Sequence, residues 1–315
     1  MPSIRRPRSG SMQFWPRKRA SRAYARIRSW VISDKAKPLG FIGYKVGMTH
    51  FIGIIDNKHS HLKGQNVAFP VTIVECPPIR IFSVRFYKTQ NHALKLQKEI
   101  FFKTEKQLAR KIKVPKETSK ELESINSEDF DVMRLSVYTQ PHKAGFGKKK
   151  PEIFEMALGG SIKEQITFLK ANVDKEIDIT NVFEENQLVD IHAITKGKGF
   201  QGPVKRFGIG LKPHKSEKGR RAPGSLGPWV RQQHISHRVA HAGQMGFYQR
   251  IDYHKQILKI SNEVEQIGKD FHKYGNIKST YIVLHGSIPG AKKRPIIMST
   301  SKRGKNTKHQ LTIQE

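Results

Sequence analysis

The sequence has a single cysteine, no long apolar run and two long stretches almost without acidic residues. Cys76 alone among 315 residues excludes an intramolecular disulfide and fits a reducing compartment. Because it follows an apolar run and precedes Pro77 and Pro78, we expect a buried, unreactive thiol at a strand end. No apolar run approaches the roughly 18–20 residues that a membrane-spanning helix needs, so no membrane partner is expected.

Acidic residues are scarce in two basic stretches that lie far apart in the chain. Residues 1–28 hold nine Lys and Arg and no acid, and residues 196–250 hold twelve against one acid, Glu217. Together they carry +20 of the formal net charge of +32, whereas residues 91–187 hold 17 basic and 16 acidic residues. Charge that served only solubility would be interspersed. Segregated positive charge therefore indicates a polyanionic partner, and nucleic acid fits best.

The N-terminal stretch also has the Arg- and Ser-rich, acid-free composition of a mitochondrial transit peptide. Pro2, Pro7 and Pro16 would interrupt the amphipathic helix that such a peptide forms, and targeting does not explain the internal basic stretch. An arm this polar buries too little apolar area to offset the cost of ordering, so we expect it to order against its partner.

Strand signals lie on both sides of the internal basic stretch. A β-rich run from Gly40 to Ile55 is interrupted by glycines, which suggests bends or close backbone approach. Short strands from distant parts of the chain, with few helices between them, predict a β-barrel and a mainly β fold. The other expected strands are Phe69–Cys76, Arg80–Tyr87, Leu188–Thr195, Ile251–Ile260, Thr280–His285 and Pro295–Thr300.

The charge-balanced residues 91–187 predict a self-contained α+β insertion. Helical signals cover Thr104–Lys113 and Ser119–Ile125, and Asp131–Thr139 alternates as a strand does. Ser161 and Glu164 have the spacing of a capping box that opens a helix through about Asn172. We assign this insertion no chemistry.

Residues Gly197–Gly202 match the G-x-G-x-x-G pattern of dinucleotide sites. That site requires a helix to begin there, but Gly208, Gly210 and Pro213 follow within ten residues of Pro203. We therefore interpret the pattern as a flexible loop whose glycines let the backbone approach phosphates. An RNA-modifying enzyme that uses this loop for a nucleotide-like cofactor is the alternative, and a DNA-packaging protein is a third class.

Metal and catalytic signals are weak. His234, His237 and His241 share a spacing that could place imidazoles together, but with no cysteine and no acid nearer than Asp252 a zinc site lacks a ligand. A nuclease or polymerase would need carboxylates near the phosphates to hold metals. No metal, cofactor or catalytic residue is therefore expected.

The aromatic residues of the basic stretch could instead stack on unpaired bases. They are Phe200, Phe207, Trp229, Phe247 and Tyr248.

Several motifs resemble one known family over nearly the whole chain and in the right order. The most distinctive is Thr195-Lys-Gly-Lys-Gly-Phe-Gln-Gly-Pro-Val-Lys-Arg-Phe-Gly208. Together these segments resemble the universal L-three family of large-subunit ribosomal proteins, in its archaeal and eukaryotic branch. The other matching segments are Pro7–Ala20, Gly40–Thr49, Pro70–Glu75, Gly224–Trp229, Ala242–Gly246 and Gly286–Gly290.

The resemblance implies a closed β-barrel of the translation-protein type that carries an α+β insertion and docks on large-subunit rRNA. It implies that the internal basic stretch is a finger reaching towards the peptidyl-transferase centre, with Trp229 at its tip. The family is non-catalytic and helps nucleate subunit assembly. The implied partners are large-subunit rRNA and neighbouring large-subunit proteins, with no small-molecule substrate, and the implied location is the cytoplasm, bound to ribosomes.

Two departures from the family pattern concern the finger. The short Trp-x-Pro-x-x-Val stretch of the family is replaced by a longer one from Trp229 to Val239 that lacks the proline, and Phe207 stands where a tryptophan is common.

The expected organisation follows the chain from end to end. It is a basic N-terminal arm at 1–38, a first barrel part at 39–90, the α+β insertion at 91–187, a barrel strand at 188–195, the basic finger loop at 196–250, a second barrel part at 251–300 and a polar, fraying C-terminal tail at 301–315.

The residues expected to bind rRNA come from both basic stretches. They are Arg5, Arg6, Arg8, Arg17, Lys18, Arg19, Arg22, Lys196, Lys198, Phe200, Lys205, Arg206, Lys212, Lys215, Arg220, Arg221, Trp229, Arg231, Arg238, Gln244 and Arg250.

Overall fold

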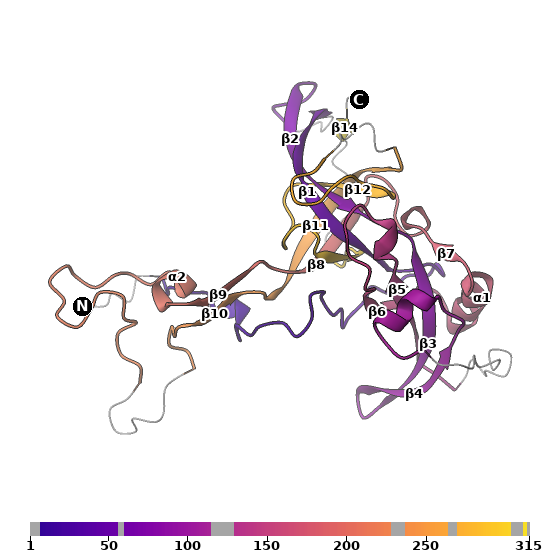
Figure 1. Cartoon of the computed structure of the whole chain (residues 1–315), viewed down its shortest axis with the longest axis horizontal. Coiled ribbons are helices and arrows are strands. Elements are labelled where there is room, and N and C mark those ends of the chain that lie inside the picture. The colour runs from indigo at the N-terminus through magenta and orange to yellow at the C-terminus, as the bar shows by residue number, and fades with distance from the viewer. Residues whose placement is uncertain are drawn as a thin grey trace. The chain divides into compact units, whose positions relative to one another are not determined.

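The computed structural model describes residues 7–55, 60–114, 129–227, 237–263 and 270–303, together with the backbone of 311–313. The chain divides into two compact units (Figure 1). Unit 1 combines Met1–Ala23 with Ile194–Gln249, and unit 2 combines Tyr24–Ala193 with Arg250–Glu315.

Unit 2 contains a seven-stranded sheet whose strands come from both ends of the sequence. Its order is β13-β8-β11-β12-β2-β1-β14, and β13 also pairs with β1. The expected strands in this sheet are confirmed, and the protein is mainly β as predicted. The strands are β1 (Gly40–Ile55), β2 (Asn66–Glu75), β8 (Leu188–Ile194), β11 (Gln249–Ser261), β12 (Tyr281–His285), β13 (Pro295–Thr300) and β14 (Leu311–Ile313).

Glycines in β1 allow the close backbone approach that their spacing predicted. A Cβ on Gly43 would lie 2.6 Å from the Sγ of Cys76, and one on Gly40 would lie 2.8 Å from the backbone oxygen of Met298. The β1–β2 register shifts between Lys45 and Gly47, which marks an irregularity in the ladder. These positions therefore accept only glycine without a shift of their neighbours.

A second sheet in unit 2 is built mostly from the insertion. It runs β4-β3-β5-β6, and β7 pairs with β3. Residues 79–90 are expected in the first barrel part, but β3 pairs with β4, β5 and β7 instead. Two prolines after β2 explain this, because residues without an N–H interrupt a ladder and let the chain change sheet. The strands are β3 (Ile79–Gln90), β4 (Ala93–Phe101), β5 (Val132–Thr139), β6 (Ile153–Ala157) and β7 (Glu176–Ile177).

The helices of unit 2 are short. Helix α1 (Ile162–Asn172) begins at the predicted capping box, where the Glu164 carboxylate accepts the backbone N–H of Ser161 at 3.1 Å. The helix expected over Thr104–Lys113 is a 3₁₀ turn, η2 (Lys106–Arg110), and the one expected over Ser119–Ile125 lies outside the described residues. Two further 3₁₀ turns are η3 (Pro141–Lys143) and η4 (Ile179–Asn181).

Apolar side chains cover both faces of the seven-stranded sheet. One cluster joins it to the insertion and includes Phe41, Val84 and Leu135. A separate cluster on other positions of the same strands includes Tyr44, Ile73 and Val283. Cys76 is 1% exposed, as predicted, and burial raises the pKa of its thiol.

The carboxylate of Glu75 lies inside this core. Glu75 is fully buried at the end of β2. Its oxygens accept the backbone N–H groups of Gly145 at 3.0 Å, of Lys278 at 2.7 Å and of Ser279 at 3.1 Å. The hydroxyls of Ser279 and Tyr274 also donate to it. A buried charge that accepts this many hydrogen bonds ties three segments of unit 2 together.

The segment from Tyr24 to Pro38, expected as part of the N-terminal arm, belongs to unit 2. Ala25 and Ile27 are buried, and the backbone N–H of Gly160 donates to the Ser33 carbonyl at 2.6 Å. A Cβ on Gly159 would lie 2.3 Å from the Lys35 carbonyl oxygen. We call residues 24–38 the strap, because they run against the insertion.

In the tail expected to fray, β14 pairs with Gly53–Ile55 of β1. Within the described residues, no helix is both long and apolar enough to cross a membrane.

Unit 1 has few regular elements. Strands β9 (Gly197–Gln201) and β10 (Gly243–Gly246) form an antiparallel pair, and helix α2 (Pro203–Phe207) follows β9 (Figure 1). Pro203 at the first position favours this helix start, and Gly208 ends it at a positive φ of 69°. A 3₁₀ turn, η1 (Met12–Phe14), lies in the N-terminal part.

Candidate nucleic-acid interface

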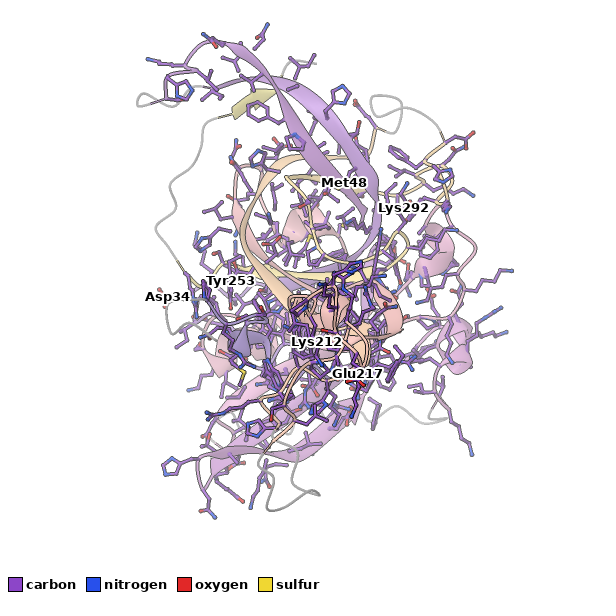
Figure 2. All side chains as sticks on the ribbon, turned by 90° about the vertical axis from the view of Figure 1, so that its left-hand side faces the viewer. Asp34, Met48, Lys212, Glu217, Tyr253 and Lys292 are labelled. Carbon is purple, nitrogen blue, oxygen red and sulfur yellow. The ribbon has the colours of Figure 1, made fainter. Side chains whose placement is uncertain are left out.

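Unit 1 concentrates the positive charge of the chain. Its 79 residues hold 18 Lys and Arg and one acid, Glu217 (labelled in Figure 2), whereas unit 2 holds 40 Lys and Arg against 25 acids. With a single carboxylate in the unit, its cations cannot be neutralised internally. Their field is therefore available to a polyanion.

Arg206 of α2 is the hydrogen-bonding centre of this unit. Its Nε donates to the carbonyl of Gln244 at 2.9 Å and its Nη1 to that of His241 at 2.9 Å. Its Nη2 donates to the carbonyl of Arg17 at 3.3 Å. One guanidinium thus joins α2, the segment around β10 and the N-terminal part of the chain, which is the geometry that a rigid fork of donors favours.

The N-terminal part also packs on Phe207. The guanidinium carbon of Arg17 lies 4.2 Å from the centroid of the Phe207 ring, and the Trp15 ring lies 5.5 Å from it. Arg17 Nη1 donates to the carbonyl of Arg206 at 2.6 Å. Burial lowers the pKa of Arg17, with the nearby charge of Arg206 acting in the same direction. Phe207 is only 6% exposed, so unit 1 has a small interior of its own.

The predicted binding residues fall into two groups. Arg17, Arg206 and Gln244 are partly buried and make hydrogen bonds within unit 1, where Gln244 Nε2 donates to the carbonyls of Met245 and Gly246. Lys212 and Arg250 are also partly buried, and Arg250 belongs to unit 2. The exposed group is Arg8, Lys18, Arg19, Arg22, Lys196, Lys198, Phe200, Lys205, Lys215, Arg220, Arg221 and Arg238.

Some exposed cations are nevertheless held in place. Arg8 donates to the carbonyl of Arg238 at 2.5 Å, and the guanidinium of Arg19 lies 5.5 Å from the centroid of the Phe247 ring. The backbone N–H of Ala20 donates to the carbonyl of Phe247 at 2.9 Å. These contacts fix the N-terminal segment along β9 and β10, so cations from both basic stretches share one unit.

Two predicted base-stacking residues are buried instead. Phe207 and Tyr248 are 6% and 7% exposed, whereas Phe200 is 77% exposed. The hydroxyl of Tyr248 donates to the carbonyl of Gln244. Phe207 and Tyr248 therefore pack inside unit 1, and stacking on a base is open to Phe200, which projects from β9.

The glycine pattern at 197–202 is not the flexible loop that we expected. Gly197 and Gly199 lie in β9, which pairs with β10 through Phe200 and Gln244. Helix α2 after it has five residues, too short for the nucleotide-binding helix of a dinucleotide fold. The cofactor-binding alternative therefore lacks its structural basis.

Four predicted binding residues lie outside the described part of the chain: Arg5, Arg6, Trp229 and Arg231, as does His234 of the histidine series. Sequence reasoning left out Lys218, which is exposed in unit 1, and Arg26 and Arg28, which are exposed on the strap. A simple count of basic residues in the two stretches would have included all three.

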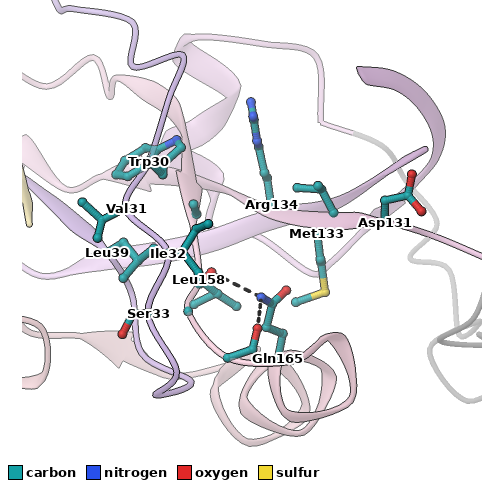
Figure 3. Close-up of a pocket in the computed structure, with 14 residues that line it drawn as sticks. Trp30, Val31, Ile32, Ser33, Leu39, Asp131, Met133, Arg134, Leu158 and Gln165 are labelled. Carbon is teal, nitrogen blue, oxygen red and sulfur yellow. Dashed lines mark hydrogen bonds between the residues drawn. The ribbon is translucent and has the colours of Figure 1, made fainter. Parts of the chain in front are cut away.

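Unit 2 contains a pocket of about 280 Å³ between the strap and the insertion (Figure 3). Trp30 and Ile32 of the strap line it, together with Met133 of β5 and Gln165 of α1. Gln165 Nε2 donates to the carbonyls of Leu158 at 3.2 Å and Gly160 at 2.9 Å. These bonds hold α1 to the segment that precedes it, and the strap contacts the same segment through the hydrogen bond from Gly160 to Ser33. We assign the pocket no ligand.

The fold and the charge define a class: a mainly β protein with a polycationic unit formed by two distant parts of the chain. Comparison with known proteins gives the family. The family model for ribosomal protein L3 matches residues 1–313. Large ribosomal subunit protein uL3 of Archaeoglobus fulgidus is 40% identical over 302 residues, covering 93% of this chain and 91% of that protein.

Two further archaeal relatives agree. The uL3 protein of Methanocaldococcus jannaschii is 41% identical and covers 94% of this chain and 91% of its own length. That of Methanobrevibacter smithii is 40% identical, with 95% and 93% covered. The chain belongs to the ribosomal protein L3 family, a family of structural ribosomal proteins and not of enzymes.

Proposed function

We propose that this protein is a structural constituent of the large ribosomal subunit that binds rRNA mainly through unit 1 and helps nucleate subunit assembly. It acts while bound to ribosomes, beside neighbouring large-subunit proteins. The observation that carries the proposal is the joining of two acid-poor segments, separated by about 170 residues of sequence, into one unit with 18 basic residues and one acid. A polyanion that contacts both segments neutralises charge that the protein leaves uncompensated.

In this proposal the seven-stranded sheet is the folded domain from which the finger extends. Its ladder runs from β1 through β2, β12, β11, β8 and β13, and the β13–β1 pairing supports a closed barrel. The stretch 196–250 leaves this sheet after β8 and returns at β11. We propose that it is a finger that reaches through rRNA towards the peptidyl-transferase centre, with Trp229 at its tip.

The internal contacts of unit 1 assign different roles to its cations. Arg206 uses all three guanidinium nitrogens on backbone carbonyls and Arg17 uses its Nη1 on one, so these residues orient the segments. Exposed residues such as Lys196, Lys198 and Lys205 have the access that phosphate contacts require. Phe200 adds an exposed ring that can stack on an unpaired base.

The test is a salt titration of the binding of the full chain to large-subunit rRNA. With roughly 6–10 phosphate contacts, affinity should fall about 10³–10⁵-fold between roughly 50 and 200 mM salt. Replacing three exposed cations together (Lys196→Gln, Lys198→Gln, Lys205→Gln) should make the slope of log affinity against log salt shallower by about three.

The matched control removes the same charge from exposed positions of unit 2: Lys88→Gln, Lys95→Gln and Lys103→Gln. This variant should keep most of the original slope. A flat salt dependence of the unmodified chain would reject rRNA binding by these cations. Equal slopes for the two triple variants would reject unit 1 as the main contact.

A further inference from the structure

The outer parts of β1 and β2 form a two-stranded ribbon with an unusual composition. We call residues 46–55 and 66–72 the distal ribbon. In it, Met48 pairs with Thr72, His50 with Pro70, and Ile52 with Ala68. Figure 1 shows the ends of β1 and β2 extending together beyond β12, and Figure 2 labels Met48 on this ribbon.

The distal ribbon has an exposed apolar face. Alternate residues of a strand point to the same side, so Met48, His50 and Ile52 share a face with their partners across the ladder. Met48 is 49% exposed and Ile52 is 51% exposed, and Ala68 and Pro70 are exposed as well. On the opposite side, Phe51 packs against the core, and the Phe69 ring lies 5.7 Å from the ring of His285.

The ribbon is also free of charge in a strongly basic chain. Its 17 residues include no Lys, Arg, Asp or Glu, although the whole chain has 58 Lys and Arg and a net charge of +32. His50 is its one titratable side chain. A surface that meets phosphates needs cations to replace their counterions, and the distal ribbon has none to offer.

We propose that the distal ribbon is a docking surface for a neighbouring protein, which meets it with an uncharged apolar surface. A polyanion and an acidic protein are disfavoured, because nothing on the ribbon would compensate the charge they bring. Exposed Met48 and Ile52 instead gain by burial against apolar atoms, and the flexible Met side chain adapts to an irregular surface.

The outer edge of β2 lies next to this apolar face. Strand β12 pairs with Val71–Glu75 only, so among the described residues the outer edge of Asn66–Phe69 has no strand beside it. An open edge next to an apolar face lets a partner add backbone hydrogen bonds to side-chain contacts. This inference rests on the proposed function in one respect, that the neighbour is another large-subunit protein.

The experiment uses full chains assembled into large subunits, with a photo-cross-linking residue at position 52 or at position 198. Position 52 should give a cross-link to a different protein, and position 198, in the basic unit, should give one to rRNA. A cross-link from position 52 to rRNA or to a second copy of this chain, or none in intact subunits, would overturn the docking surface. A failure at position 198 alone would count against the proposed function and not against the ribbon.

Charge on the ribbon gives a second test. The double variant Met48→Asp with Ile52→Asp is made without a cross-linking residue. On washed subunits it should weaken retention of the neighbouring protein identified from position 52 about tenfold or more, as loss of a buried apolar anchor does. Leu94→Asp with Leu96→Asp is the control, because these β4 residues are 43% and 48% exposed. It should leave that retention unchanged. Unchanged retention in the ribbon variant would reject the proposal, provided that its thermal unfolding matches that of the unmodified chain.

Discussion

The guanidinium of Arg17 lies 4.2 Å from the centroid of the Phe207 ring, so a cation of the N-terminal segment covers an aromatic residue of the internal basic stretch. Arg206 next to that ring returns a hydrogen bond to the Arg17 carbonyl. This reciprocal contact holds together two like-charged segments, because the ring face and the carbonyl oxygens supply the negative partial charges that the single carboxylate Glu217 cannot.

The first prediction concerns Arg206→Lys, which keeps the charge and removes the fork of donors. A single ammonium cannot reach the carbonyls of Arg17, His241 and Gln244 together. We expect the contact between the segments to open more often. Amide exchange at Ala20, whose N–H donates to Phe247, should speed up about tenfold or more.

The control for this prediction is Lys205→Arg, an exposed neighbour on α2 whose charge is also kept. It should leave the exchange rate of Ala20 unchanged. If Arg206→Lys also left that rate unchanged, the guanidinium would not hold the segments together in solution.

The second prediction concerns the buried carboxylate of Glu75. In Glu75→Gln the carboxylate becomes a neutral amide with one acceptor oxygen, so the N–H groups of Gly145, Lys278 and Ser279 share a single, weaker acceptor. We expect a loss of about 2 kcal/mol in the free energy of unfolding, measured by urea titration. The exposed Glu184→Gln should change it by less than about 0.5 kcal/mol. Equal midpoints for the two variants would show that the Glu75 network contributes nothing to stability.

The third prediction is a pH dependence that arises from His192. Burial lowers the pKa of His192 to about 4, with Lys302 acting in the same direction and Asp190 opposing them. In the unfolded chain the pKa of the imidazole is near 6.5. Between the two pKa values the unfolded state therefore binds a proton at His192 and the folded state does not. Stability should therefore be full above about pH 6.5 and fall as the pH drops towards 4, by about 2 kcal/mol at pH 5.

Urea unfolding at pH 7.5 and pH 5 isolates this contribution. His192→Gln should reduce the difference between the two pH values by about 2 kcal/mol, whereas the exposed His272→Gln should leave it as it is. An unchanged difference in the His192 variant would mean that this imidazole becomes protonated in the folded protein at ordinary pH.

The strands could be predicted where local pattern decides them. Pro295–Thr300 was predicted to the residue, because an apolar β-branched run lies there between turn residues. The start of α1 was predicted because Ser161 and Glu164 satisfy each other locally. The partner of β3 was not predicted, because pairing with β5 depends on residues about fifty positions away and leaves no local signal.

In the candidate interface, too, local sequence predicts some features and long-range packing decides the others. Composition located its cations, but it could not separate Phe200 from Phe207, since both are aromatic residues between glycines and basic residues. Their exposures of 77% and 6% follow from long-range packing on Trp15 and Arg17. For the same reason the sequence groups Arg17 and Arg206 with the phosphate-binding residues, although Arg206 uses its three guanidinium nitrogens, and Arg17 its Nη1, on carbonyls inside unit 1.

The last prediction concerns Trp229, which lies outside the described residues and is the proposed tip of the finger. A tip residue meets rRNA and packs on nothing in the protein. Trp229→Ala should therefore leave the thermal unfolding of the free protein unchanged, while assembled subunits carrying it lose activity in peptide transfer or tRNA binding.

The comparison that decides this case is Phe207→Ala, because Phe207 is an aromatic residue of the same stretch that is buried in unit 1. Truncating a buried ring costs stability of about 3–5 kcal/mol in a well-packed core, and less in a unit this small. Phe207→Ala should thus increase the proteolysis of unit 1 in the free protein, and Trp229→Ala should not. If Trp229→Ala destabilised the free protein as Phe207→Ala does, Trp229 would belong to an interior, and the finger tip would have to be sought elsewhere in 196–250.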